Sequence, residues 1–212
     1  MLVLFRPVDD ATLLLDQALK MLHSWTTGVL RFDENVRPVR YVIAPDGRLV
    51  MPAMVAMLST LDTALHIPDE DPDGLQVLVE LHELDPDGPE GNLTDRWRIY
   101  HGEPEDLQWA VLDIDFARFR EASIDGEALV VANTLAGAEP KLCALVNGHH
   151  AEALRTLVME NLQITASQPL LVGIDPAGLD VRVDHGVVRL DSVLGNDAQA
   201  ASGALLGALG VV

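Results

Sequence analysis

The fold is decided by the stretch from Leu171 to Leu190, which reads LVGIDPAGLDVRVDHGVVRL. Two turn sequences, DPAG at 175–178 and DHG at 184–186, divide it into three short runs rich in Val, Ile and Leu. Such runs between Gly-containing turns are typical of short antiparallel strands. Before them, apolar residues recur at helical spacing from Leu142 onwards. The sequence therefore predicts one or two helices followed by a three-stranded antiparallel meander.

The composition is that of an acidic globular protein. The 212 residues include 14 Lys and Arg against 33 Asp and Glu, which gives a net charge of −19. This negative field repels phosphate backbones and anionic lipid, so neither nucleic acid nor a membrane surface is an expected partner. Cys143 is alone and is expected to be a buried apolar residue in a reducing compartment. The start, from Met1 to Asp10, lacks the pattern of a secretory signal, and a cytoplasmic protein is predicted.

The N-terminal two thirds of the chain predict one helix followed by a barrel. Asp9 and Asp10 precede apolar residues at helical spacing up to Leu22, which predicts a capped amphipathic helix. Alternating patterns and Asp-Gly turns then predict strands at 28–32, 39–43, 48–51, 64–67, 76–84, 95–100, 109–119 and 128–131. Helical crossovers are missing between these runs, so the sheet should be antiparallel and closed into a small barrel.

Two readings of the segment from Leu142 to Leu157 stay open. A continuous helix places His149 in its apolar stripe and His150 at the edge of that stripe. Alternatively, Asn147 caps a second helix and the histidines lie near its start. Adjacent histidines on a helix point about 100° apart and cannot form an i, i+4 metal pair, so structural or interface roles are favoured over metal binding. The tail, 198–212, is expected to form a small-residue helix packed on the body, or else a frayed end.

Both halves of the chain resemble known families. RPVRYVIAPDGRLV, at 37–50, is similar to the first barrel hairpin of the pyridoxamine-phosphate-oxidase-like FMN-binding split barrels. LVNGHHAEAL at 145–154 and VGIDPAGLDVR at 172–182 resemble the C-terminal domain of haem-utilisation proteins. The resemblance implies an α+β fold, in which a small antiparallel split β-barrel is followed by a helix plus a three-stranded antiparallel C-terminal domain. It places the N-terminal helix and barrel in 1–135 and the second domain with the apolar tail in 136–212.

The resemblance also implies a function and a set of site residues. In this family two barrels form a homodimer with FMN at their interface, so the chain is predicted to be an FMN-binding protein and a candidate flavin-dependent oxidoreductase. Arg37 and Arg40 are the cations expected near the flavin phosphate, where Ser59 and Thr60 could donate hydrogen bonds. The face formed by Trp97, with Arg98 on the alternate side of its strand, could stack on a flavin or porphyrin ring, although a place in the core is favoured.

Two departures from the family pattern define an alternative function. The segment MPAMVAMLSTLD, at 51–62, holds neither a histidine nor a cation where relatives contact the flavin phosphate. No histidine follows His185, whereas the relatives that degrade haem are expected to ligate iron close to the C-terminus. Haem is therefore not expected. The alternative is a cofactor-free binding or regulatory dimer that has lost the phosphate-binding residues and contacts a protein partner.

Overall fold

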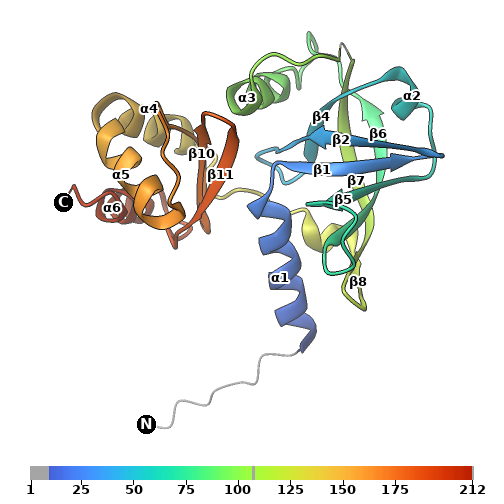
Figure 1. Cartoon of the computed structure of the whole chain (residues 1–212), viewed down its shortest axis with the longest axis horizontal. Coiled ribbons are helices and arrows are strands. Elements are labelled where there is room, and N and C mark those ends of the chain that lie inside the picture. Colours follow the sequence, from blue (N-terminus) through green and yellow to red (C-terminus); the bar gives the residue numbers. More distant parts are fainter. Residues whose placement is uncertain (1–9, 107, 212) are drawn as a thin grey trace.

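The computed structural model describes residues 10–106 and 108–211, which form an eight-stranded and a three-stranded antiparallel sheet with their helices (Figure 1). This confirms the predicted α+β fold. The elements, in chain order, are α1 (Asp10–Ser24), β1 (Thr27–Phe32), β2 (Asn35–Arg40), β3 (Val42–Ile43), β4 (Leu49–Ala53), α2 (Val55–Leu58), β5 (Thr63–Ile67), β6 (Leu75–Glu83), α3 (Asn92–His101), β7 (Gln108–Phe119), β8 (Ala122–Asp125), the 3₁₀ turn η1 (Gly126–Leu129), α4 (Glu139–His149), α5 (Ala151–Leu162), β9 (Leu170–Asp175), β10 (Gly178–Val183), β11 (Gly186–Asp191) and α6 (Ala198–Ala208).

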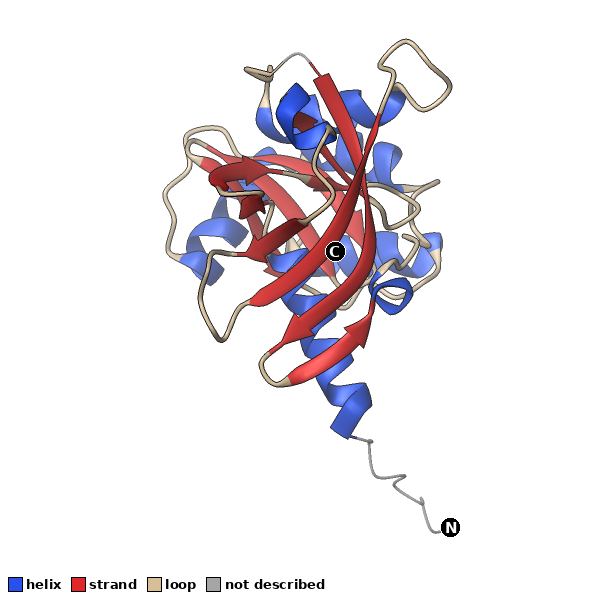
Figure 2. Ribbon diagram, turned by 90° about the vertical axis from the view of Figure 1, so that its right-hand side faces the viewer, coloured by secondary structure: helices blue, strands red, loops and turns tan. Residues whose placement is uncertain are grey.

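The large sheet is a curled half-barrel whose strands run in the order β2-β1-β5-β6-β7-β4-β3, with β8 added beside β7 (Figure 2). Alternation along β1 shows why it curls around a core: Leu30 and Phe32 point inward, while Thr27 and Arg31 are exposed. The predicted strand 39–43 is interrupted at Tyr41, whose backbone N–H donates to the carbonyl oxygen of Thr26 over 2.9 Å. Because of this break, its two parts become the opposite ends, β2 and β3, of the sheet order.

Helix α1 packs on the barrel and ends beside the small sheet. Ala18 and Leu22 are fully buried in the barrel core, as the amphipathic pattern predicts. Asp9, the other predicted capping residue, lies outside the described residues. The last turns of α1 reach β9 and β11, where Lys20 pairs with Asp191 and His23 contacts Asp175. The helix therefore lies against both sheets.

The strand predicted at 95–100 is wrong, because this segment lies in α3. Leu93, Trp97 and Tyr100 recur at helical spacing and are all buried, whereas Ile99, which alternation placed beside Trp97, is 54% exposed. The buried face of α3 packs against the barrel and contacts Val172 of the small sheet. The alternation over four residues favours a strand only weakly. Burial of one helical face against two sheets outweighs this preference and stabilises the helix.

The strand predicted at 128–131 is also wrong. The backbone instead enters the 3₁₀ turn η1, where the Asp125 side chain accepts a hydrogen bond from the N–H of Glu127. Gly126 allows this turn to lie against β7, because a Cβ there would stand 1.9 Å from the carbonyl oxygen of Ile114. The capping hydrogen bond of Asp125 and the close approach of Gly126 to β7 therefore favour a 3₁₀ turn over the strand that the apolar run at 128–131 predicted.

The helices of the C-terminal part break at His150, so a continuous helix is wrong, whereas a second helix, α5, does begin beside the histidines. Asn147 does not cap a helix; its amide accepts from the Leu171 N–H (2.8 Å) and donates to the Leu171 carbonyl (2.9 Å), which attaches α4 to β9. The tail does form a helix, α6, capped by Asp197 and buried through Ala201 and Leu205. Val212 lies outside the described residues.

The apolar residues gather in one cluster inside the barrel, one under the small sheet and one at the contact with α3. Leu135 belongs to the cluster under the small sheet. The domain boundary at 135/136 stays a prediction. Across residues 10–106 and 108–211, none of the helices combines the length and apolar character needed to cross a membrane.

Candidate functional site

A cavity of about 660 Å³ lies where the barrel, α1 and the small sheet meet. Its apolar wall includes Leu19, Trp25, Ile43, Val131, Pro176 and Val193, which come from α1 and the residue after it, from β3, from the segment before α4 and from the region of the small sheet. Trp25 and Val131 are 43% and 47% exposed, so they offer apolar surface to a bound molecule. A concave, mostly apolar space of this size is typical of small-molecule sites.

The polar side of the cavity begins at α3. Arg96 donates to both carboxylate oxygens of Glu139, over 2.8 and 3.1 Å, and its Nε donates to the carbonyl oxygen of Ile43 over 2.8 Å. One turn later, the Tyr100 hydroxyl accepts from Arg96 over 3.1 Å and donates to Asp180 on β10 over 2.9 Å. The side chain of Glu139 is only 7% exposed. These bonds join α3, α4 and the small sheet through charged groups.

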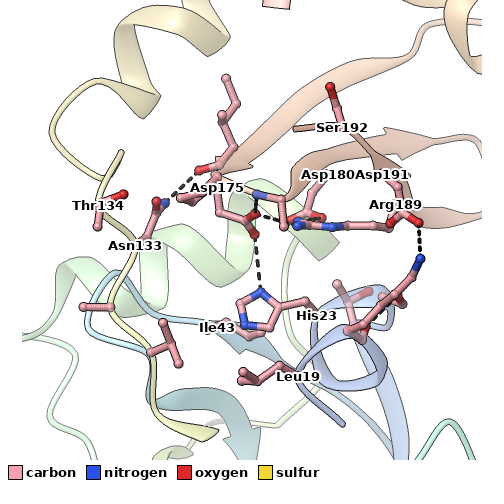
Figure 3. A pocket seen from close by; sticks show the side chains of 18 of the residues that line it. Leu19, His23, Ile43, Asn133, Thr134, Asp175, Asp180, Arg189, Asp191 and Ser192 are labelled. Atoms are coloured by element: carbon pink, nitrogen blue, oxygen red, sulfur yellow. Dashed lines mark hydrogen bonds and ion pairs between the residues drawn. The ribbon is translucent and has the colours of Figure 1, made fainter. Parts of the chain in front are cut away.

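The network continues across the small sheet to α1. Arg189 donates to Asp180 over 2.9 Å and to Asp175 over 2.6 Å, and its side chain is 6% exposed. The other oxygen of Asp175 lies 3.3 Å from Nδ1 of His23 (Figure 3). The Asp175 carboxylate also caps the following turn by accepting from the N–H groups of Ala177 and Gly178. His23 is therefore the last member of a network of hydrogen-bonded side chains that starts at Glu139.

The arrangement shifts the protonation of two of its members. Burial alone would raise the pKa of Asp175, but hydrogen bonds from His23 and Arg189 bring it well below its usual range. Burial, together with the neighbouring Asp180 carboxylate, raises the pKa of Tyr100 well above its usual value. Asp175 is therefore ionised and Tyr100 is neutral near neutral pH.

His23 and Asp175 resemble the orienting half of a catalytic triad, in which a carboxylate fixes a histidine. Within the described residues, however, no hydroxyl or thiol group makes a hydrogen bond to the His23 ring. The neighbouring Ser24 hydroxyl donates instead to the carbonyl oxygen of Lys20, over 2.7 Å.

Three of the four residues predicted to hold a flavin phosphate make side-chain contacts within the chain, and the fourth, Arg40, is exposed. Arg37 donates to Asp106 over 2.9 Å and contacts the sulfur of Met54. The Ser59 and Thr60 hydroxyls donate to the carbonyl oxygens of Val55 and Ala56, one turn back in α2. A helix end with free carbonyls is negative and does not favour a phosphate. Arg40 is exposed at the last position of the edge strand β2.

The predicted stacking face does not form, because Trp97 and Arg98 lie on a helix. Trp97 is 4% exposed, packs edge-on against Trp109 and donates to the carbonyl oxygen of Arg40 over 3.2 Å. This location in the core agrees with the favoured interpretation of Trp97. Arg98 pairs with Asp95 over 3.0 Å and lies over the Trp109 ring. Trp97 is therefore covered on the side that a flavin or porphyrin ring would need.

His149 and His150 lie at the junction of α4 and α5, with ring centroids 6.4 Å apart. They line a shallow groove with Glu152 and Val211, far along the chain from the cavity residues. In the part of the chain that the structure describes, no group of three or more His, Cys, Asp or Glu side chains is placed to hold a metal ion. The pair therefore lines a surface groove.

The sequence did not predict most of the residues that line the cavity, although one turn in it indicates a pair of them. The DHG turn pairs Val183 with Gly186, and this register places Asp180 opposite Arg189 on the neighbouring strand. That ion pair could have been predicted from the turn alone. The contacts of Asp180 with Tyr100 and of Asp175 with His23 could not, because 80 and 152 residues separate the partners.

Comparisons with known proteins show the fold but not a family. No family model matches the sequence, and no curated protein matches it either. A protein of unknown function from Agrobacterium tumefaciens is similar in structure, with a TM-score of 0.73, 16% sequence identity, and coverage of 98% of this chain and 100% of that one. This similarity supports the two-sheet architecture over the whole described chain.

Two further solved structures are more distant. A heme binding protein from Mycobacterium smegmatis has a TM-score of 0.43 and 19% identity, with 98% of each chain covered. A candidate pyridoxamine 5′-phosphate oxidase from Listeria innocua has a TM-score of 0.41 and 13% identity, covering 51% of this chain and 99% of that one.

The residues present do not fit FMN within one chain. A dianionic phosphate requires cations or a cluster of N–H donors. Arg37 and Arg98 already pair with carboxylates and the segment 51–62 supplies no cation, which leaves Arg40 as the one cation among the predicted site residues that pairs with no described carboxylate. The cavity between the barrel, α1 and the small sheet offers no better place, because Lys20, Arg96 and Arg189 are paired with Asp191, Glu139 and the two carboxylates of β9 and β10.

Proposed function

We propose that this protein is a flavin-independent binding protein that holds a small, largely apolar molecule in the inter-domain cavity. One observation carries the proposal: a space of about 660 Å³ has apolar walls, while the cations along its polar side are paired with carboxylates. Apolar walls supply affinity by removing ligand surface from water, and a few fixed polar groups orient the ligand. The proposed role is binding rather than redox catalysis.

A cavity-filling variant tests the location of the site. Ala132 lines the cavity and is exposed, so Ala132→Trp should occupy the space without disturbing the core. Ala200→Trp is the matched control, because Ala200 is exposed on α6 and does not line the cavity. The probe is tryptophol, a neutral indole alcohol, measured by isothermal titration calorimetry and ligand-observed NMR.

We expect tryptophol to bind the wild type and Ala200→Trp equally and to bind Ala132→Trp at least about tenfold more weakly, a difference of about 1.4 kcal/mol. Equal binding to all three proteins would place the probe elsewhere and contradict the proposal. Titration with FMN, followed by flavin absorbance and fluorescence, is expected to show no stoichiometric complex. Tight one-to-one FMN binding would instead support the rival function, a flavin-dependent oxidoreductase.

The proposal includes the homodimer that the family resemblance implies, with a protein partner as a further possible contact. A row of cross-strand neighbours on the outer face of the barrel, Val36, Arg31, Ala64 and Leu78, supports a second copy. Val36 and Leu78 are 49% and 42% exposed, so this row leaves apolar surface open to solvent. Analytical ultracentrifugation tests it: a dimer that Leu78→Lys dissociates is expected, and a monomeric wild type would contradict the proposal.

A further inference from the structure

We propose that the molecule bound in the inter-domain cavity carries one positive charge, an ammonium or amidinium group, and places it beside Asp175. This inference rests on the proposed binding function and names the class of its ligand: a compact, largely apolar amine. The reasons are the charge balance of the polar side, the position of Asp175 within it, and the charge of the cavity rim.

The charges along the polar side do not balance. Glu139, Asp180 and Asp175 contribute three carboxylates, whereas Arg96 and Arg189 contribute two guanidinium groups. The carboxylates of the network thus exceed its guanidinium groups by one, in a poorly exposed place. An uncompensated charge in such a place is costly, and a nearby cation relieves this cost. A bound ammonium group can supply that cation.

The excess charge is accessible at Asp175 rather than deeper in the network. One oxygen of Asp175 accepts from Arg189 and from the turn N–H groups, while the other contacts only the side chain of His23 among the described residues. Both residues line the cavity, and Figure 3 shows the His23 ring beneath this oxygen, beside Leu19 and Ile43. Glu139, in contrast, is covered by Arg96 and the N–H of Ile174. Asp175 is therefore the carboxylate of the network that is best placed to accept a cation from the cavity.

The rim of the cavity adds to the preference for a cation. Asp16 and Asp191 lie on it, and the single ammonium group there, that of Lys20, already pairs with Asp191 at 2.6 Å. Trp25 presents a partly exposed aromatic ring that can attract a cation through its π face. The net charge of −19 over the whole chain attracts cations over longer distances. Anionic ligands, including phosphates and carboxylates, meet the opposite field.

Three indoles that differ only in charge test the inference. Tryptamine is cationic, tryptophol is neutral and indole-3-acetate is anionic at neutral pH, while all three carry the same ring and nearly the same chain. Calorimetry on the full-length wild type should show tryptamine binding at least about tenfold more tightly than tryptophol, with indole-3-acetate weakest. The preference for tryptamine should decrease when salt is added, because salt screens charge interactions.

Asp175→Asn tests the assigned carboxylate. Its side-chain oxygen can still accept from Arg189, and circular dichroism checks that the variant is folded. The ratio of tryptamine to tryptophol affinity should fall towards one in Asp175→Asn and stay unchanged in the control Asp113→Asn, whose side chain is exposed on β7 away from the cavity. An unchanged ratio in Asp175→Asn would overturn the assignment of this carboxylate.

The ligand series on the wild type decides the inference even if Asp175→Asn fails to fold. Equal affinities for the three indoles, or tightest binding of indole-3-acetate, would overturn the inference and leave the proposed binding function standing. Absence of binding by all three would overturn the proposed function itself.

Discussion

Removing one oxygen atom from Tyr100 tests whether the charged network joins the two sheets. In Tyr100→Phe, Asp180 loses a donor at 2.9 Å and Arg96 loses an acceptor at 3.1 Å. A hydrogen bond to a charged group contributes about 1.5–3 kcal/mol, and the Tyr100 side chain is 2% exposed, so water does not readily replace it. We expect the free energy of unfolding to fall by about 2–3 kcal/mol.

The second tyrosine of the chain provides the matched control. Tyr41 is equally buried, but its hydroxyl donates over 3.2 Å to a neutral group, the carbonyl oxygen of Leu22. Such a bond contributes about 0.5–1.5 kcal/mol, so Tyr41→Phe should cost about 1 kcal/mol. Urea unfolding followed by tryptophan fluorescence and circular dichroism measures both values. If Tyr100→Phe costs no more than Tyr41→Phe, the charged network does not contribute to stability as argued.

Three more substitutions examine the same region. Gly173→Ala would place a Cβ 1.8 Å from the Tyr100 hydroxyl oxygen. The substitution should lower the free energy of unfolding by about 1–3 kcal/mol in the wild type and by less in Tyr100→Phe, and a double-mutant cycle measures the difference. Glu139→Gln leaves Arg96 without its counter-charge and should cost about 3–5 kcal/mol in urea unfolding, whereas Glu70→Gln, in the exposed pair with Arg31, should cost less than about 1 kcal/mol; similar costs would contradict this reasoning. Burial lowers the pKa of His101 from 6.5 to about 4, so between these pH values the unfolded chain binds the proton and the native state does not. Stability should therefore fall as pH falls through this window, by up to about 1.4 kcal/mol per pH unit. His101→Gln should flatten this pH profile, which thermal unfolding measures.

The sequence predicted the elements whose apolar pattern had one interpretation. The apolar run at 109–112 is buried on both faces of a strand, and the alternation that follows it up to Phe119 buries one face; both lie in β7, as predicted. At 95–100 two patterns overlap: alternation pairs Trp97 with Ile99, whereas helical spacing pairs Trp97 with Leu93 and Tyr100. Packing of the helical face against the barrel and against Val172 of the small sheet decides between them. Such packing is tertiary information that a local pattern does not contain.

The candidate site was predicted less well than the fold, for a physical reason. The resemblance pointed to Arg37 and the alternation at 95–100 pointed to Arg98, but the fold places a carboxylate beside each of them. The cavity residues come from α1, β3, α3, a connecting segment and the small sheet, and none is distinctive within its own segment. Their chemistry arises only where these parts meet. A turn register can predict Asp180 beside Arg189, but it cannot place α1 or α3 over them.

The interface between the two sheets combines two kinds of contact with different consequences. The apolar contact of Trp97 and Tyr100 with Val172 removes surface from water but does not fix a direction. The bonds of Arg96 with Glu139 and of Tyr100 with Asp180 each require one geometry. Buried ion pairs add little net stability, because desolvation offsets their attraction. Their effect here is to fix how the barrel and the small sheet face each other, and the shape of the cavity depends on that orientation. The network that leaves Asp175 with its excess charge is thus the same network that holds the walls of the cavity in place.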